Sequence, residues 1–389
     1  MKRLILCCDG TWNHAANQYV SNVEKIARVL ERGPVGDGVV QIVEYVGGVG
    51  SQGYLLDKLL GGAFGSGLTQ NVVEGYRFLA MNYAPGDEIV VLGYSRGAYT
   101  ARSVVGMVGA VGLLTREALA AGALHDAVRL YREPADDDAA RLAREEERAA
   151  FRREHSHGGD AGTPVRFLGV FDTVGTLGVP GLTRRRYRFH DVRLGDDVEV
   201  ARQALAVDER RLSYAPCLWE VPADSPEGRV QQVWFVGGHG DVGGGGPRCG
   251  LSDAALEWMV DELRTVGVVV DDALWSSQCT HQEELVLDVR PRLLFRLINR
   301  AKRLLPGSGS MGGREVFRHG LRVLARRDGE VWGDGVCVAG PVVRYVERDG
   351  YAEHAPNLQR WLDEAGGVDQ VPVVPVEAWR DDERRLVVR

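Results

Sequence analysis

The stretch that decides the fold is Glu88-Ile-Val-Val-Leu-Gly-Tyr-Ser-Arg-Gly-Ala98, in which an apolar run leads into a serine flanked by glycines. The unbroken run from Glu88 to Leu92 is typical of a strand in a parallel sheet, because such strands are covered on both faces. A helical pattern follows from Ala98 to Leu114. We therefore expect a strand, a sharp turn at Ser95 and a helix.

On both sides of this stretch, apolar runs typical of strands alternate with the 3.6-residue periodicity of helices. The predicted strands are 3–8, 39–46, 165–171 and 230–236, and the predicted helices begin after Ser21 and cover 72–80 and 252–266. This alternation predicts the α/β class, with a doubly wound, mostly parallel sheet.

Residues 116–164 differ from the rest, because alanine, arginine and glutamate dominate there and no strand-like run occurs. Such a composition favours charged surface helices. We interpret the chain as a single domain over 1–389 with a helical insertion or cap at 116–164 and a C-terminal extension at 285–389.

Composition excludes several classes of protein. The 389 residues carry a net charge of −7, which argues against nucleic acid as a partner. The longest uncharged apolar stretch, Val104 to Leu114, has 11 residues, and a bilayer span needs about 20. The N-terminal run, Leu4 to Cys8, is too short for a signal peptide. We expect a cytoplasmic location, with export by a secretion system left open.

The motif Gly93-Tyr-Ser-Arg-Gly97 matches G-x-S-x-G, the pattern of a nucleophile held on a strand-to-helix turn. In so tight a turn a Cβ atom at position 93 or 97 would clash with neighbouring chain. We expect Ser95 to be a nucleophile. The alternative is a serine in an ordinary tight turn.

A nucleophilic serine needs a base and a carboxylate that orients the base. Asp172 follows the predicted strand 165–171, and His239 follows the strand 230–236 with a glycine on each side. The chain order Ser95, Asp172, His239 is that of α/β hydrolases. The reserve candidates for the base are His14, His319 and His354.

An oxyanion hole needs two donors. The amide of Arg96 is the expected first donor, and the loop Asp9-Gly10-Thr11 after the first strand offers the second through Gly10 or Thr11. Turn and helix-cap chemistry is the alternative role for Asp9 and Thr11. Asp241 has three candidate roles, which are orienting the base, binding a cation and capping a glycine loop.

Two other functions stay open at this point. Four side chains at strand ends could form a divalent-metal site of a phosphoesterase, namely Asp9, Asp172, His239 and Asp241. The chain could also be a non-catalytic binding protein on a hydrolase scaffold. The leading interpretation requires neither metal nor cofactor.

Two basic segments could contact a membrane surface peripherally. They are Arg184 to Arg188 and Pro291 to Pro306, the second with a leucine-rich stripe. Basic amphipathic helices bind anionic headgroups. For 291–306 we favour the simpler interpretation, a solvated helix packed on the sheet.

Four strings carry a family resemblance: Cys8-Asp-Gly-Thr-Trp-Asn13, Gly93 to Arg102, Val170 to Gly175 and Trp234 to Gly245. Over roughly residues 1–265 the chain resembles the bacterial and fungal α/β-hydrolase family that includes type VI secretion phospholipase effectors. The resemblance implies a serine esterase acting on lipids or phospholipids, with Ser95, Asp172 and His239 at its centre. The residues alone indicate only an acyl ester, and a toxin role, an immunity partner or an export partner does not follow.

Overall fold

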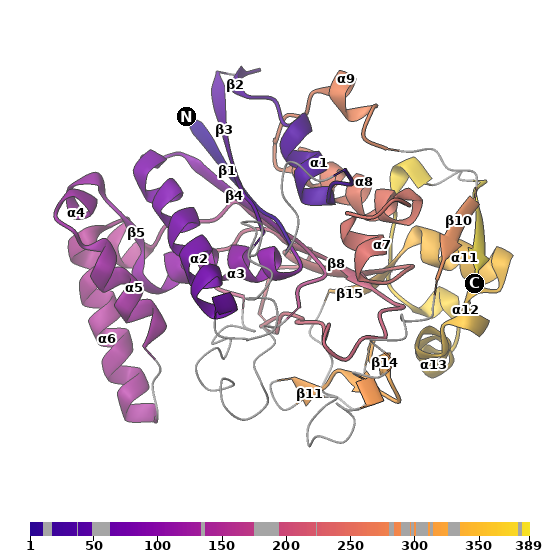
Figure 1. The fold of residues 1–389 in the computed structure, drawn as a ribbon. Coiled ribbons are helices and arrows are strands. Elements are labelled where there is room, and N and C mark those ends of the chain that lie inside the picture. Colours follow the sequence, from indigo (N-terminus) through magenta and orange to yellow (C-terminus); the bar gives the residue numbers. More distant parts are fainter. Residues whose placement is uncertain are drawn as a thin grey trace.

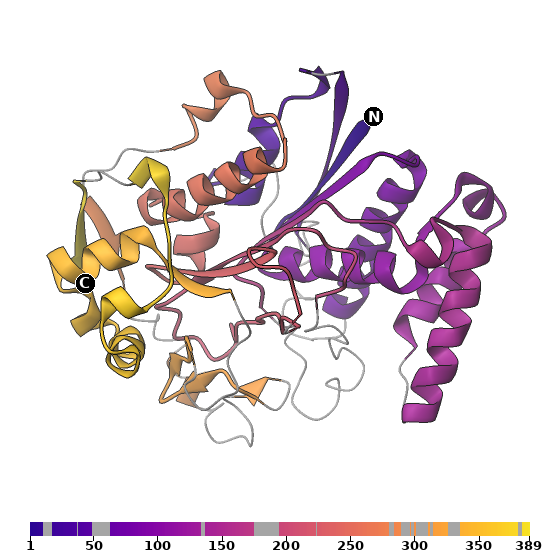
Figure 2. The ribbon, with the colours of Figure 1, turned by 180° about the vertical axis from the view of Figure 1, so that it is seen from behind.

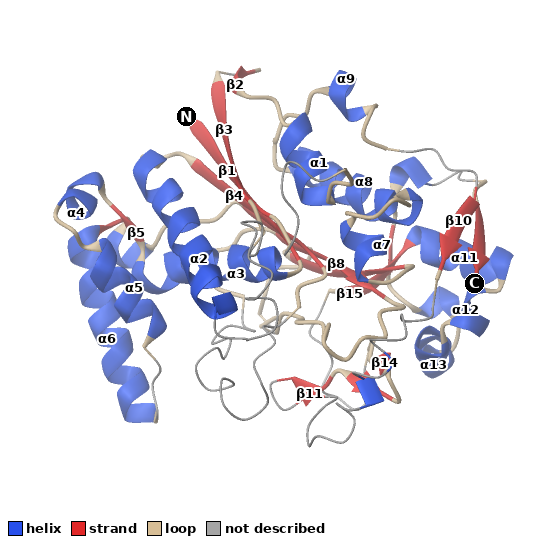
Figure 3. Cartoon of the chain, viewed as in Figure 1, coloured by secondary structure: helices blue, strands red, loops and turns tan. Residues whose placement is uncertain are grey.

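The computed structural model describes residues 1–10, 18–36, 38–48, 63–133, 137–174, 194–222, 224–279, 284–288, 296, 299–300, 310–311, 314–325, 335–379 and 383–389. Their centre is a nine-stranded sheet in the order β16-β15-β9-β8-β7-β4-β1-β3-β2, seen obliquely in Figures 1 and 3. All pairs in it are parallel except that of β2 with β3. The predicted α/β class and mostly parallel sheet are confirmed.

Of the nine sheet strands, β1, β3, β4, β7 and β9 lie where the apolar runs predicted them, whereas β2, β8, β15 and β16 were not predicted. Their bounds are β1 Lys2–Cys8, β2 Gly33–Val35, β3 Val39–Val46, β4 Glu88–Tyr94, β7 Phe167–Phe171, β8 Ala201–Ala206, β9 Val230–Phe235, β15 Val336–Ala339 and β16 Val373–Val374.

Side chains of the central strands alternate between two apolar cores, one on each face of the sheet. Ile5 and Leu92 belong to the core that contains α1 (Asn22–Val29) and α8 (Gly250–Thr265). Leu6 and Val91 belong to the other core, with α2 (Ala63–Asn82) and α3 (Arg96–Val111). Helices thus cover both faces, as Figures 1 and 2 show, and both faces of the strands are apolar for that reason.

The helix after Ser95 ends earlier than predicted. α3 stops at Val111, and Leu113–Leu114 form the short strand β5 against β6 (Ser156–His157). Gly112 between them has φ +71°, and a Cβ atom there would lie 2.2 Å from Ser156 Oγ. Because only glycine adopts this conformation readily, the glycine ends the helix. The prediction of a helix to Leu114 was wrong in its last turn.

Residues 116–164 are mainly helical in the described part, with α4 (Arg116–Ala120), α5 (Leu124–Arg132) and α6 (Asp138–His155), and they also contain the short strand β6. Helix α6 has no buried residue and carries several Arg–Glu ion pairs, such as that of Arg152 with Glu145. It lies at one side of the molecule in Figure 1. The domain boundaries proposed from the sequence stay predictions.

The C-terminal region contributes to the same sheet through β15 and β16, which were not predicted. Other short elements of the described chain are α7 His239–Gly243, α9 Asp272–Trp275, β10 Glu284–Leu287, β11 Ser310–Met311, β12 Arg314–Glu315, β13 Phe317–Arg318, β14 Leu321–Arg322, α11 Gly340–Asp349, α12 Tyr351–His354, α13 Pro356–Ala365 and β17 Arg385–Val388. Within the described ranges, no helix combines the length and apolar character needed to cross a membrane.

Candidate active site

Ser95 lies on a strained turn between β4 and α3. Its backbone has φ +57° and ψ −118°, a conformation that residues other than glycine rarely adopt. The Ser95 N–H donates to the carbonyl of Phe171 at 3.0 Å, which ties the turn to the end of the neighbouring strand β7. Strain of this kind persists only where the surroundings enforce it, and it is concentrated at functional sites.

The glycines on either side of this turn are required by close backbone contacts. A Cβ atom at Gly93 would lie 2.6 Å from the Cα of Ala98, and one at Gly97 would lie 2.2 Å from the carbonyl oxygen of Cys8. The expected clashes are therefore confirmed. At Gly97 the contact is with the end of β1, so the turn packs directly against that strand.

Replacing Gly97 by alanine should destabilise the protein by about 2–3 kcal/mol or more, since backbone atoms of Cys8 and Asp9 must move to admit the methyl group. Gly195→Ala is the matched control, because a Cβ atom there meets nothing within 4 Å, and its effect should stay within about 0.5 kcal/mol. Urea unfolding of the two variants measures both values. Equal stabilities would contradict the close contact at position 97.

His239 lies beside Ser95 at the start of α7. Its Nε2 is 2.8 Å from Ser95 Oγ, and its Nδ1 is 2.6 Å from Asp172 Oδ2. The rings of Tyr94 and Tyr214 each lie 4.8 Å from the imidazole ring, centroid to centroid, and hold it in place. With the proton on Nδ1, the imidazole donates to Asp172 and can accept the Ser95 proton at Nε2.

Asp172 follows β7 and is wholly buried, with φ +41°. Its carboxylate also contacts Arg322 on β14, through Nη1 to Oδ1 at 2.6 Å and Nη2 to Oδ2 at 2.9 Å. Burial alone would raise the pKa of Asp172, but the Arg322 charge and the His239 hydrogen bond outweigh it and lower that pKa. The carboxylate is therefore ionised throughout the neutral range.

Burial and the Asp172 carboxylate shift the pKa of His239 in opposite directions. Burial lowers it and the carboxylate raises it, and burial prevails. The imidazole is therefore neutral at pH 7 and able to accept a proton.

The reserve candidates for the base lie elsewhere in the chain. His319 stands in the turn between β13 and β14, and His354 ends α12, where its carbonyl accepts from Arg210 at 3.2 Å. His14 lies outside the described residues. Of the described candidates for the base, His239 is the one bonded to Ser95.

The loop after β1 was expected to supply the second oxyanion donor. Its Gly10 N–H donates to Asp9 Oδ1 at 2.6 Å. Asp9 Oδ2 in turn accepts from Ser21 at 2.7 Å and Tyr45 at 2.6 Å. Asp9 thus holds the loop and the start of α1, which is the turn and cap role. Thr11 lies outside the described residues.

Arg96 and Asp241 each occupy a helix start. Arg96 is the first residue of α3, so its N–H lies at the positive end of that helix, next to Ser95. Asp241 Oδ2 accepts from the Gly238 N–H at 2.9 Å and caps α7. Of the three roles considered for Asp241, its contacts fit the cap.

Of the four side chains considered for a metal site, Asp172 and His239 bond each other, whereas Asp9 and Asp241 bond other groups. Asp9 is bonded to Ser21 and Tyr45, Asp172 to His239 and Arg322, and Asp241 to Gly238. Among the residues that the structure describes, no group of three or more histidine, cysteine or acidic side chains is arranged to hold a metal ion. The arrangement gives the metal-site hypothesis no support.

Two features of the site were not predicted. The first is the pair of tyrosine rings, although Tyr94 stands next to Ser95 in the motif and could have been noticed. The second is Arg322, which is 150 residues from Asp172 and stands in no recognisable motif. The basic segment 184–188, and nearly all of 291–306, lie outside the described residues.

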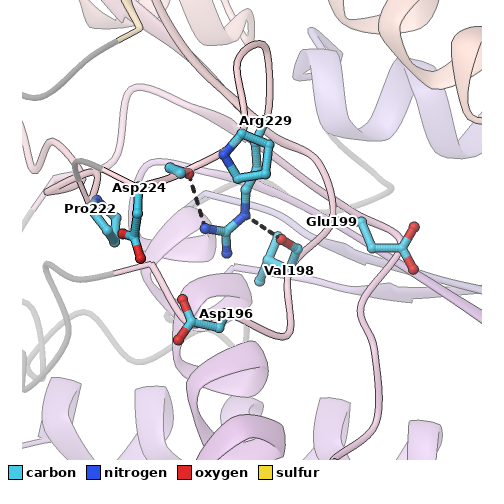
Figure 4. A pocket seen from close by; sticks show the side chains of 8 residues that line it. Asp196, Val198, Glu199, Pro222, Asp224 and Arg229 are labelled. Carbon is cyan, nitrogen blue, oxygen red and sulfur yellow. Dashed lines mark hydrogen bonds between the residues drawn. The ribbon is translucent and has the colours of Figure 1, made fainter.

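A separate hollow of about 300 Å³ lies at the amino ends of the strands, before β8 and β9 begin. Its lining includes Asp196, Glu199, Asp224 and Arg229, and Figure 4 shows Arg229 bonded to the Val198 carbonyl. None of the site residues discussed above lines it, because Ser95 follows the carboxyl end of β4.

Comparisons with known proteins give one family match. Residues 2–262 match the family described as T6SS, Phospholipase effector Tle1-like, catalytic domain. The uncharacterized protein YEL023C of Saccharomyces cerevisiae is 30% identical over 227 residues, which are 54% of this chain and 31% of the yeast protein. The match therefore spans about a third of the length of that relative.

Two solved structures are similar at low identity. One is an uncharacterized protein from Pseudomonas aeruginosa, with 15% identity, a TM-score of 0.39 and coverage of 78% of this chain and 53% of that chain. The other is Thermogutta terrifontis esterase 2 phosphoramylated by tabun, with 14% identity, a TM-score of 0.32 and coverage of 68% and 83%.

Proposed function

Because the chain belongs to the Tle1-like family of type VI secretion phospholipase effectors, through their catalytic domain, we propose that it hydrolyses carboxylic esters of lipids by way of an acyl-enzyme on Ser95. Family membership supports lipid-ester hydrolysis. The observation that carries the serine mechanism is the hydrogen-bonded line from Ser95 Oγ through His239 to Asp172, with links of 2.8 Å and 2.6 Å.

In the proposed reaction, His239 Nε2 removes the Ser95 proton as Oγ attacks the ester carbonyl. The tetrahedral oxyanion is held by the Arg96 N–H and by a second donor from the loop after β1, for which Gly10 and Thr11 are the candidates. His239 then returns the proton to the leaving alcohol, and the carbonyl re-forms as the acyl-enzyme. Water attacks this ester with His239 again as base, which releases the fatty acid and restores Ser95.

Asp172 has two tasks in this scheme. It keeps the Nδ1 proton on the side away from Ser95, so that Nε2 can accept, and it stabilises the imidazolium that forms in each half-reaction. The two tyrosine rings limit rotation of the imidazole, and the hydrogen bond from the Ser95 N–H to the Phe171 carbonyl limits movement of the turn. Little rearrangement of the reacting groups is then needed before attack, and groups positioned in advance in this way accelerate a reaction.

The acid limb of kcat/KM should have its midpoint below 6.5, the ordinary pKa of histidine, because burial lowers the pKa of His239. The imidazole must be neutral to accept the proton, so activity is lost as the pH falls through that pKa. Initial rates on a soluble ester from pH 4.5 to 9 measure the midpoint, with incubation at each pH as a control for unfolding. A midpoint at pH 7.5 or above would contradict His239 as the base.

The products distinguish this function from phosphoester cleavage. Vesicles of phosphatidylcholine should yield free fatty acid and lysophospholipid, without a phosphorylated headgroup, and the reaction should persist in EDTA. Mass spectrometry of the lipid and aqueous phases identifies both product classes. Release of phosphocholine, abolished by EDTA, would favour the metal-dependent alternative, and no product from lipid but hydrolysis of short esters would restrict the substrate to simple esters.

A further inference from the structure

Arg322 is a fully buried charge that the reaction scheme above does not use. It lies on β14, which pairs with β13, beyond residues 2–262 that match the family model. Both nitrogens at its tip bond the two oxygens of Asp172, and the exposure of the two side chains is 0%. A planar guanidinium bound to both carboxylate oxygens fixes the carboxylate plane as well as its charge.

The same guanidinium connects Asp172 to the rest of the site. Nη1 donates to the Ala206 carbonyl at 2.9 Å, and Nη2 donates to the Tyr214 carbonyl at 2.7 Å. Ala206 ends β8 and donates its own N–H to Asp172 Oδ1 at 3.1 Å, while the Tyr214 ring contacts His239. One side chain therefore joins the carboxylate, the end of β8 and the segment that covers the imidazole.

The C-terminal helices hold Arg322 in this position. Asn357 on α13 donates through Nδ2 to the Arg322 carbonyl at 3.2 Å and to the Val207 carbonyl at 3.0 Å. Tyr351 on α12 donates to Asp208, which also accepts from the Gly237 N–H, two residues before His239. The C-terminal region thus packs around the base and the carboxylate.

The charge of Arg322 is permanent, because guanidinium does not deprotonate in proteins. It partly neutralises Asp172, the group that stabilises the imidazolium of His239. Among the described residues, other polar or titratable groups that face His239 are Ser95 and Tyr94 from the β4 turn, Glu209, Arg211 and Tyr214 after β8, and Asp241 on its own helix. Arg322 bonds both oxygens of the carboxylate that His239 bonds, whereas Arg211 bonds Glu209.

We propose that Arg322 is a positioning residue for the base of the active site: it fixes the plane of the Asp172 carboxylate and, by neutralising part of its charge, keeps the imidazolium of His239 from being over-stabilised. The proposal rests on the proposed serine mechanism. It assigns the C-terminal region, which lies outside the family match, a part in positioning the base.

Three single substitutions separate positioning from stability. Arg322→Lys keeps the positive charge but loses the pair of nitrogens that bonds both carboxylate oxygens. Arg322→Met removes the charge and the pair of nitrogens. Arg202→Met is the control, since Arg202 is another buried arginine, paired with Glu262 at 2.6 Å, on the start of β8 and away from Ser95. Two readouts apply to each: kcat and KM on a soluble nitrophenyl ester, and the pKa of His239 from an NMR titration, with its signal identified by its loss in His239→Gln.

With Arg322→Met, kcat should fall about 100-fold with KM nearly unchanged, and the pKa of His239 should rise by about one unit because the carboxylate is no longer neutralised. With Arg322→Lys, kcat should fall about tenfold and the pKa should stay near the wild-type value. Arg202→Met should change neither. In an Asp172→Asn background, the kcat effect of Arg322→Met should shrink to less than about threefold.

An unchanged His239 pKa in folded Arg322→Met, or a fall in kcat no larger than that of Arg202→Met, would overturn the proposal. If Arg322→Met fails to fold, kcat of Arg322→Lys is the test instead. A kcat of Arg322→Lys equal to that of the wild-type protein would then overturn the proposal. A wild-type protein without esterase activity would refute the proposed function instead, whereas the NMR titration would still test the link from Arg322 to His239.

Discussion

Replacing Ser95 by alanine should lower kcat for ester hydrolysis by about 10⁶-fold, to the level that binding and the oxyanion donors alone can sustain. The alanine cannot form an acyl-enzyme. Among the described residues, Ser95 Oγ is the side-chain group bonded to His239 Nε2, so the variant has no second nucleophile in that position. KM should change little, because the hydroxyl acts on the transition state rather than on substrate binding. Rates on a soluble ester at high enzyme concentration measure the residual activity.

Ser103→Ala is the control for this substitution, since Ser103 is also buried on α3 but lies two turns beyond Ser95. It should retain wild-type kcat. A Ser95→Ala protein with more than about 1% of wild-type kcat would remove the serine from the mechanism, since loss of a nucleophile costs far more than that.

Changing Asp172 to asparagine should lower kcat by about 10⁴-fold at neutral pH. The amide cannot stabilise an imidazolium, and its NH₂ group favours the tautomer with the Nδ1 lone pair facing it and the proton on Nε2, where it blocks transfer from Ser95. The substitution also leaves the buried Arg322 charge without its partner, so thermal unfolding must accompany the kinetics. A folded variant within tenfold of wild-type kcat would show that another group orients His239.

Glu209 is the group to examine in that case. Its Oε2 accepts from the His239 backbone N–H at 3.2 Å and is held by Arg211 at 2.6 Å. It touches the backbone rather than the ring nitrogen, so Asp172→Asn and Glu209→Gln should have very different effects. Comparable losses in the two variants would argue against the assignment of Asp172.

The sequence was sufficient for several strands whose own side chains are apolar. β4 and β7 could be located because all or nearly all of their residues are buried, and a short unbroken apolar run bounded by turn residues is typical of a buried strand. The turn at Ser95 could be recognised because its constraints are local: two glycines and the residues between them. For the same reason, the strand ends that carry Asp172 and His239 were identifiable, although their catalytic roles stay predictions.

β8 was missed because its burial depends on distant partners. Its residues Arg202 and Gln203 are buried polar side chains, which in sequence resemble a solvated loop. Arg202 pairs with Glu262, and Gln203 accepts a hydrogen bond from Thr173. A polar residue becomes compatible with the core only once such partners are in place, and no local pattern reveals them.

Gly10 and Arg322 show the same limit within the site. The end of β1 lies beside the nucleophile strand, since β1 pairs with β4. The hydrogen bond from the Gly10 N–H to Asp9 Oδ1 is a detail of side-chain geometry that no sequence pattern reveals. Arg322 reaches Asp172 and the Ala206 carbonyl at the end of β8 through tertiary contacts that have no sequence signal.

The central claim is that Ser95 is a nucleophile activated by His239. The most direct measurement is the intact mass of the wild-type protein and of Ser95→Ala after reaction with a fluorophosphonate, which phosphonylates an activated serine and expels fluoride. We expect one added phosphonyl group on the wild-type protein and none on the variant. A modification of both proteins, or of neither, would contradict the account.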